Sequence, residues 1–137
     1  MGSSRTRHYR ASHGVDEWIT GFDRGLRTLT GTHQAARPNP AKDVAESDLT
    51  AQERSHVAGL MRVNHTGEVC AQALYEGQAL MASDTKAKAS LMSASAEEQD
   101  HLVWCRSRLR ELDSRPSLLD PVFFGLSFAL GAAAGLM

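Results

Sequence analysis

The sequence Glu98-Gln99-Asp100-His101 lies inside a long helical pattern and places a carboxylate and an imidazole three residues apart. Residues at i and i+3 share one face of a helix, so Glu98 and His101 point toward the same spot. Carboxylate-bridged metal centres in helical bundles use this Glu-x-x-His spacing together with single Glu residues from other helices. A four-residue pattern is a weak signal, because solvated carboxylates such as Glu97 explain many similar runs. The pattern therefore needs support from a second helix.

The support comes from Arg62-Val63-Asn64-His65-Thr66-Gly67-Glu68, where a carboxylate interrupts an otherwise apolar helical stripe. The stripe predicts that His65 and Glu68 lie on or beside the buried face. A short loop joins this helix to the next, so the two should pack antiparallel and bring Glu68 opposite Glu98. Three roles are open for His65. It could bind the metal, donate a hydrogen bond to Glu68 without binding the metal, or be an ordinary core histidine. We favour the hydrogen bond to Glu68.

The remaining sequence shows no strand-like alternation and predicts an all-α fold. The expected helices span residues 15–29, a segment from a cap at Ser47 or Asp48 to about Met81, residues 86–112 after a cap at Asp84, and a final stretch from Leu118. Residues 1–13 carry no periodic pattern and are expected to be unstructured.

Two prolines, Pro38 and Pro40, divide the chain into two parts. They disfavour helix and predict an extended linker along the outside, which ends near Glu46. We therefore expect a short helix and linker over residues 1–46, followed by a helical domain over residues 47–137.

The composition narrows the functional classes. The 137 residues carry a formal net charge of −1, and no basic field favours nucleic acid as a partner. Cys70 and Cys105 lack metal-site or disulfide-framework spacing, which is typical of a reducing compartment. The basic, polar start is followed by no apolar segment of the kind that export signals contain. These features predict a location on the cytoplasmic side.

The end of the chain is apolar and uncharged from Val122 to Met137. Sixteen residues form a helix of about 24 Å, which is shorter than the roughly 30 Å hydrocarbon core of a bilayer. The Gly131-x-x-x-Gly135 spacing predicts close approach of another helix, in a membrane or in a bundle. A buried bundle helix and a shallow membrane-inserted helix both stay open as interpretations.

Longer stretches around these motifs resemble a known family. They are LMRVNHTGEVCAQALY at residues 60–75, EEQDHL at 97–102, RPNP at 37–40 and GLSFALG at 125–131. Together they resemble the demethoxyubiquinol hydroxylases of ubiquinone biosynthesis, in the form found in proteobacteria. The resemblance covers about residues 18–137 and is more specific than any single motif.

The resemblance implies a ferritin-like di-iron monooxygenase, peripheral on the cytoplasmic face of the membrane. Its substrates would be a polyprenyl methoxy-methyl-benzoquinol and O2. The family's first three iron ligands fall on Glu68, Glu98 and His101, with Glu98 as the bridge between two irons about 3.5–4 Å apart. The rest of this ligand set, a further Glu and a second Glu-x-x-His, has no counterpart here.

Three explanations account for the half set of ligands: a shortened gene copy, a piece containing the first half, or a homodimer that supplies six ligands across a two-fold axis. We favour the first two, because they need no new interface. We expect one chain alone to bind iron weakly and to turn over little substrate. The alternative function is a non-catalytic helical module that binds membrane or quinone and retains the motif as a relic.

Overall fold

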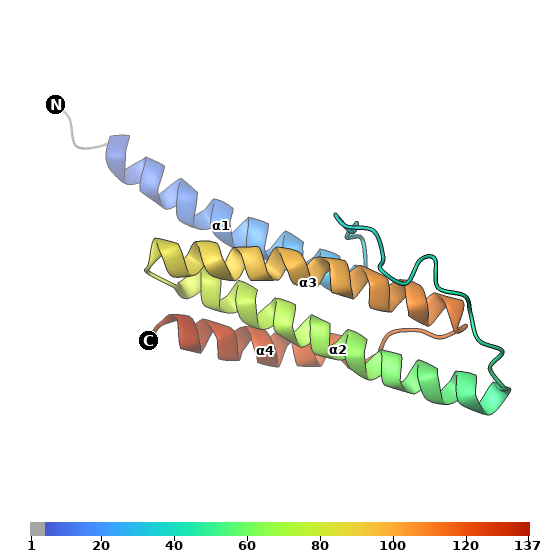
Figure 1. Cartoon of the computed structure of the whole chain (residues 1–137). Coiled ribbons are helices and arrows are strands. Elements are labelled where there is room, and N and C mark those ends of the chain that lie inside the picture. The colour runs from blue at the N-terminus through green and yellow to red at the C-terminus, as the bar shows by residue number, and fades with distance from the viewer. Residues whose placement is uncertain (1–4) are drawn as a thin grey trace.

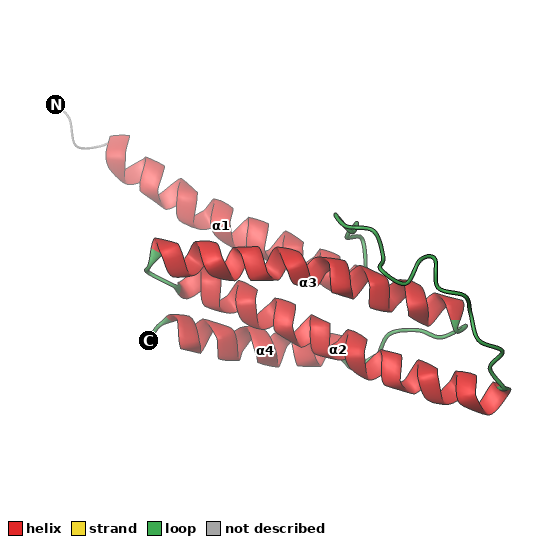
Figure 2. Ribbon diagram, viewed as in Figure 1, coloured by secondary structure: helices red, strands yellow, loops and turns green. Residues whose placement is uncertain are grey.

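The fold is a set of four helices joined by loops. The computed structural model describes residues 5–137, with side-chain surroundings from residue 14 onward. The helices are α1 (Arg5–Thr30), α2 (Ala51–Met81), α3 (Thr85–Glu111) and α4 (Asp120–Gly135) (Figure 1). Residues 5–137 contain no strand (Figure 2). The all-α prediction is confirmed, and the arrangement is consistent with a partial ferritin-like bundle.

The helices α2 and α3 form the predicted antiparallel hairpin (Figure 1). Thr50 caps α2 in a capping box, because its side chain accepts from the backbone N–H of Glu53 while the Glu53 carboxylate accepts from the Thr50 N–H. The prediction of a cap at Ser47 or Asp48 was therefore wrong. Asp84 caps α3 as predicted, by accepting hydrogen bonds from the first backbone N–H groups of the helix.

Helix α1 is much longer than predicted. It begins at Arg5 and runs for 26 residues, so the expectation of an unstructured segment was wrong for residues 5–13; residues 1–4 lie outside the described part. Residues 5–13 lack apolar periodicity, and they also lack any proline or glycine that would end a helix. The helix ends as predicted at Gly31, whose φ of 73° lies in the left-handed region that glycine adopts easily.

Helix α4 packs closely along α2. It begins at Asp120, two residues later than predicted, with Pro121 in its first turn. A Cβ atom added at Gly131 would overlap the backbone carbonyl of Leu74, and one at Gly135 would overlap that of Gln78. The predicted Gly-x-x-x-Gly approach is thus confirmed, and its partner is α2. Among residues 5–137, no helix combines the length and hydropathy needed to cross a bilayer.

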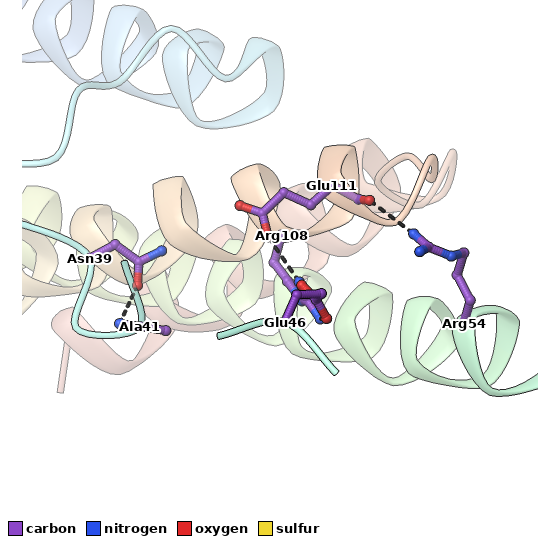
Figure 3. Close-up of polar contacts among 6 residues, drawn as sticks. All are labelled: Asn39, Ala41, Glu46, Arg54, Arg108 and Glu111. Atoms are coloured by element: carbon purple, nitrogen blue, oxygen red, sulfur yellow. Dashed lines mark hydrogen bonds and ion pairs between the residues drawn. The ribbon is translucent and has the colours of Figure 1, made fainter. Parts of the chain in front are cut away.

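The linker lies along the outside of α3, as predicted. Near its start, the Asp100 carboxylate accepts hydrogen bonds from the Ala36 backbone N–H at 2.7 Å and from Arg37 Nε at 2.6 Å. Near its end, Glu46 pairs with Arg108, which also reaches Glu111 (Figure 3). The linker is therefore fastened to α3 at two places.

The centre of the hairpin contains polar as well as apolar groups. The most deeply buried apolar side chains are Val69, Ala73, Ala79, Leu102 and Leu109. Beside them, the Gln72 amide donates to Glu76 at 3.0 Å and to Ser95 at 2.8 Å. Burial raises the pKa of Glu76. The Gln72–Ser95 hydrogen bond joins α2 to α3 in the buried interior, whereas the Gln72–Glu76 bond lies within α2.

Candidate metal centre

Three side chains converge on one face of the hairpin. Glu68 comes from the middle of α2, and Glu98 and His101 come from the facing part of α3. One donor atom from each residue lies within 4.8 Å of the others. This convergence follows from the i, i+3 spacing on α3 and from the antiparallel pairing, which places Glu68 opposite Glu98.

The donor set suits a divalent transition metal. Two carboxylates and an imidazole are ligands that iron, manganese and zinc accept, and no thiolate stands among them. His101 Nδ1 lies 3.0 Å from Glu98 Oε2, so the ring already faces this carboxylate. The Glu98 and His101 side chains are 23% and 43% exposed, so the group opens toward solvent. The residues present therefore fit a metal with free coordination positions.

The two carboxylates perturb one another. Burial, first, and then the neighbouring Glu98 raise the pKa of Glu68 to about 7, while the nearby His101 opposes this change. Two carboxylates held this close favour a shared proton or a cation between them. A divalent ion would replace the proton on Glu68 and neutralise both groups.

This pKa predicts a pH dependence for the metal-free protein. Its free energy of unfolding should fall as pH rises from the ordinary Glu68 pKa of 4.5 to about 7, because the folded state holds a proton there that the unfolded state releases. Stabilisation by added Co(II) should increase over the same range, because the metal binds the deprotonated carboxylate. Urea unfolding at several pH values checks both trends. Glu68→Gln, which cannot titrate, should flatten the first trend; an unchanged slope would contradict the assignment.

His65 lies beside this group but faces another carboxylate. The ring is fully buried, and its Nδ1 lies 3.1 Å from Asp120 Oδ2 at the start of α4. Thr66 donates to the other Asp120 oxygen at 2.7 Å. Burial, first, lowers the pKa of His65, and the charge of Asp120 opposes this.

These contacts bear on the predicted role of His65. The structure shows no hydrogen bond from His65 to Glu68, and neither ring nitrogen has a well-aligned partner in the described chain. A role for His65 at the metal site stays a prediction, while its visible contact joins α2 to α4. Sequence reasoning did not identify Asp120 as its partner, because only the folded chain brings the start of α4 beside α2.

A cavity of about 770 Å³ lies beyond Trp104, whose ring centroid is 5.4 Å from that of His101; the three donors themselves do not line it. Met61 of α2 and Trp104 and Cys105 of α3 line it, and linker residues 39–47 form the other wall. Burial, first, and then the charge of Glu68 raise the pKa of the Cys105 thiol. Cys105 therefore lines the cavity and is also close enough to Glu68 to be influenced by its charge.

Known proteins share most of this sequence. The family model described as ubiquinone biosynthesis protein COQ7 matches residues 55–137. The 3-demethoxyubiquinol 3-hydroxylase of Burkholderia cenocepacia is 56% identical over 124 residues, which cover 90% of this chain and 60% of the relative. The proteins of the same name from Acinetobacter baylyi and Pseudomonas aeruginosa are 55% and 50% identical, and the matches cover 95% and 98% of this chain.

The extent of these matches confirms the predicted family. The chain spans about 60% of the length of the curated relatives it matches. No solved structure matches it. The family model covers well over half of the chain, including Glu68, Glu98 and His101. The chain therefore belongs to the ubiquinone biosynthesis protein COQ7 family.

Proposed function

We propose that this chain contributes a Glu68, Glu98 and His101 iron site to hydroxylation of the ring of a polyprenyl methoxy-methyl-benzoquinol. The relatives are 3-demethoxyubiquinol 3-hydroxylases, which supports this reaction. The observation that carries the proposal is the convergence of these three donors within 4.8 Å. Bound iron would supply the activation of molecular oxygen.

The residues of the chain have separate tasks in this proposal. Glu68, Glu98 and His101 would hold the iron, with Glu98 in the bridging role that the resemblance implies and the other two as terminal ligands. Met61 and Trp104 line the neighbouring cavity and supply apolar surface on one side of it. The linker encloses that side and, through Asp100, stays attached to the helix that bears two of the ligands.

A reconstitution assay tests the reaction. The purified chain is loaded with Fe(II) under anaerobic conditions and given oxygen, a chemical reductant and a short-chain demethoxyubiquinol. Formation of hydroxylated product that depends on iron and is lost in His101→Ala supports the proposal. Binding of iron without product would leave a metal site but remove the catalytic role of this chain. The alternative, a non-catalytic membrane- or quinone-binding module, predicts binding to vesicles with no retained iron.

An apolar surface on the other side of the molecule supports attachment to a membrane. The apolar stripe of α1 faces outward, and the outer side of α4 is also apolar. The exposed large residues of α1 are Val15, Trp18, Ile19, Phe22 and Leu26. Those of α4 are Val122, Phe123, Leu126 and Leu130. A groove of about 310 Å³ between α1 and α4 separates them. We propose that this side rests on the cytoplasmic face of the membrane.

Polar substitutions on α1 test the attachment. The Trp18 and Phe22 side chains are 57% and 70% exposed, so Trp18→Ser with Phe22→Ser should leave the fold intact and weaken co-sedimentation with phosphatidylcholine–phosphatidylglycerol vesicles at least about tenfold. Val44→Ser is the matched control, because Val44 is 71% exposed on the linker. Equal binding by both variants would remove α1 from the proposed membrane surface.

A further inference from the structure

A tryptophan lies beside the candidate metal site on α3. Trp104 follows His101 by three residues, so the two side chains are neighbours one turn apart on the helix. Their ring centroids are 5.4 Å apart and the ring planes are inclined at 46°, which is a favourable arrangement for two aromatic rings. The indole therefore restricts rotation of the His101 ring, whose side chain is otherwise 43% exposed.

The linker contacts the same tryptophan through Arg37. The guanidinium carbon lies over the indole, 5.7 Å from the ring centroid, which is within the range of a cation–π interaction. The indole Nε1 has no hydrogen-bond partner among residues 14–137. The position of the indole therefore depends on the groups that pack against it, and Arg37 is the charged one.

A buried carboxylate holds the guanidinium in this place. Arg37 Nε donates a hydrogen bond to Asp100 Oδ2 at 2.6 Å, and the Ala36 backbone N–H donates to Asp100 Oδ1 at 2.7 Å. The Asp100 side chain is only 3% exposed, although that of Arg37 is 52% exposed. A charge-assisted bond to a fixed partner removes much of the freedom that an exposed arginine has. The guanidinium therefore stays over the indole.

The orientation of His101 matters because a ligand must point at its metal. A coordinating side chain has to stay within about 0.5 Å of the productive geometry, which requires neighbours that lock its rotamer. His101 Nδ1 faces Glu98 at 3.0 Å, but Glu98 is itself a proposed ligand and would turn toward a bound ion. The contact with Trp104 restrains the imidazole from outside the group of donors.

We propose that Arg37 positions a metal ligand from outside the site and acts through Trp104. The guanidinium holds the indole against the His101 ring, and the indole keeps the imidazole turned toward the two carboxylates. This inference rests on the proposed metal site for its effect on metal binding. The orientation of the imidazole, in contrast, is a property of the metal-free chain and can be measured there.

Nuclear magnetic resonance of the metal-free chain at one fixed pH tests the orientation. The ring current of Trp104 acts on the His101 ring protons because the two rings lie side by side. Arg37→Gln should move the His101 signals toward those of Trp104→Leu, in which the ring current is lost. Arg108→Gln is the matched control, because Arg108 joins the far end of the linker to α3 (Figure 3) and should leave these signals in place.

Co(II) binding by the same variants tests the consequence for the site. Loss of a residue that orients a ligand lowers metal affinity 10- to 100-fold, so Trp104→Leu should weaken binding about tenfold. Arg37→Gln should weaken it about three- to tenfold, because an exposed cation–π contact contributes less. Arg37→Lys retains the charge and should recover part of this loss. Circular dichroism checks that every variant is folded.

The double variant distinguishes this route from others. If Arg37 acts through Trp104, adding Arg37→Gln to Trp104→Leu should cause no further loss of Co(II) affinity. Losses that multiply would overturn the inference and indicate a separate route through Asp100.

Three further results would also overturn the positioning role. They are unchanged His101 signals in Arg37→Gln, shifted signals with unchanged Co(II) affinity, and equal losses of affinity in Arg37→Gln and Arg108→Gln. A wild-type chain that binds no Co(II) would refute the proposed metal site instead. The His101 signals of the metal-free variants would then decide by themselves whether the linker orients the imidazole.

Discussion

Gly131→Ala is expected to lower the free energy of unfolding by about 3 kcal/mol, at the upper end for overpacked interiors. The added Cβ would overlap the Leu74 carbonyl oxygen, which belongs to the backbone of α2 and cannot rotate away as a side chain can. α4 would have to move outward along its contact with α2. Urea unfolding followed by circular dichroism measures the effect.

Gly125 provides the control for this substitution. It also lies in α4, and a Cβ added there would meet no atom within 4 Å. Gly125→Ala should therefore raise the free energy of unfolding by up to about 1 kcal/mol, because alanine favours helix over glycine. If the two variants were equally stable, close packing of α4 on α2 would not contribute as the structure indicates.

Glu98→Gln should weaken metal binding at least about 100-fold, since loss of a residue that only orients a ligand already costs 10- to 100-fold. The amide keeps the shape of the side chain but removes the negative charge with which Glu98 would hold a divalent cation. Metal content after dialysis, measured by elemental analysis, checks the prediction. Hydroxylation should fall in parallel if the proposed reaction is correct.

The adjacent Glu97→Gln is the control for charge. Glu97 is exposed and does not belong to the group of three donors. The variant removes the same charge one residue away and should retain the wild-type metal content. If both variants lost metal equally, general attraction of cations to this acidic segment would explain binding better than a defined site.

The sequence predicted the convergence of the three donors better than it predicted the ends of the helices. Helical spacing within α3 and a short loop to α2 were enough to bring Glu68, Glu98 and His101 together, because both are local rules. The Thr50–Glu53 pair is recognisable in the sequence as a capping box, but the cap was placed too early, at Ser47 or Asp48, because all three residues can cap a helix and the choice among them depends on the path of the linker. The start of α1 was missed because a polar segment carries no periodic signal even when it is helical.

The contacts of His65 could not be predicted from local spacing, because they depend on how α4 packs on α2. Its neighbour Asp120 lies more than fifty residues away in the sequence, and their pairing requires α4 to be seated on α2. The outward orientation of the apolar residues of α1 is similar: amphipathic spacing identifies a stripe but not what covers it. The sequence therefore predicted which side chains share one face of a helix, but not which other parts of the chain contact that face.

Asp100 stands between Glu98 and His101, the two proposed metal ligands of α3, and faces the linker on another side of the helix. Only one rotation of α3 about its axis allows Asp100 to contact the linker and Glu98 to face Glu68 at the same time. A shift of one residue turns a helix by about 100°, which would pull Asp100 from Arg37 and carry Glu98 away from Glu68 at the same time. A one-residue insertion in the loop before α3 can be absorbed, whereas one between Glu98 and Asp100 would make the linker contact and the approach of Glu98 to Glu68 incompatible. By binding Asp100, the linker thus fixes the rotation of α3 that directs Glu98 and His101 toward Glu68.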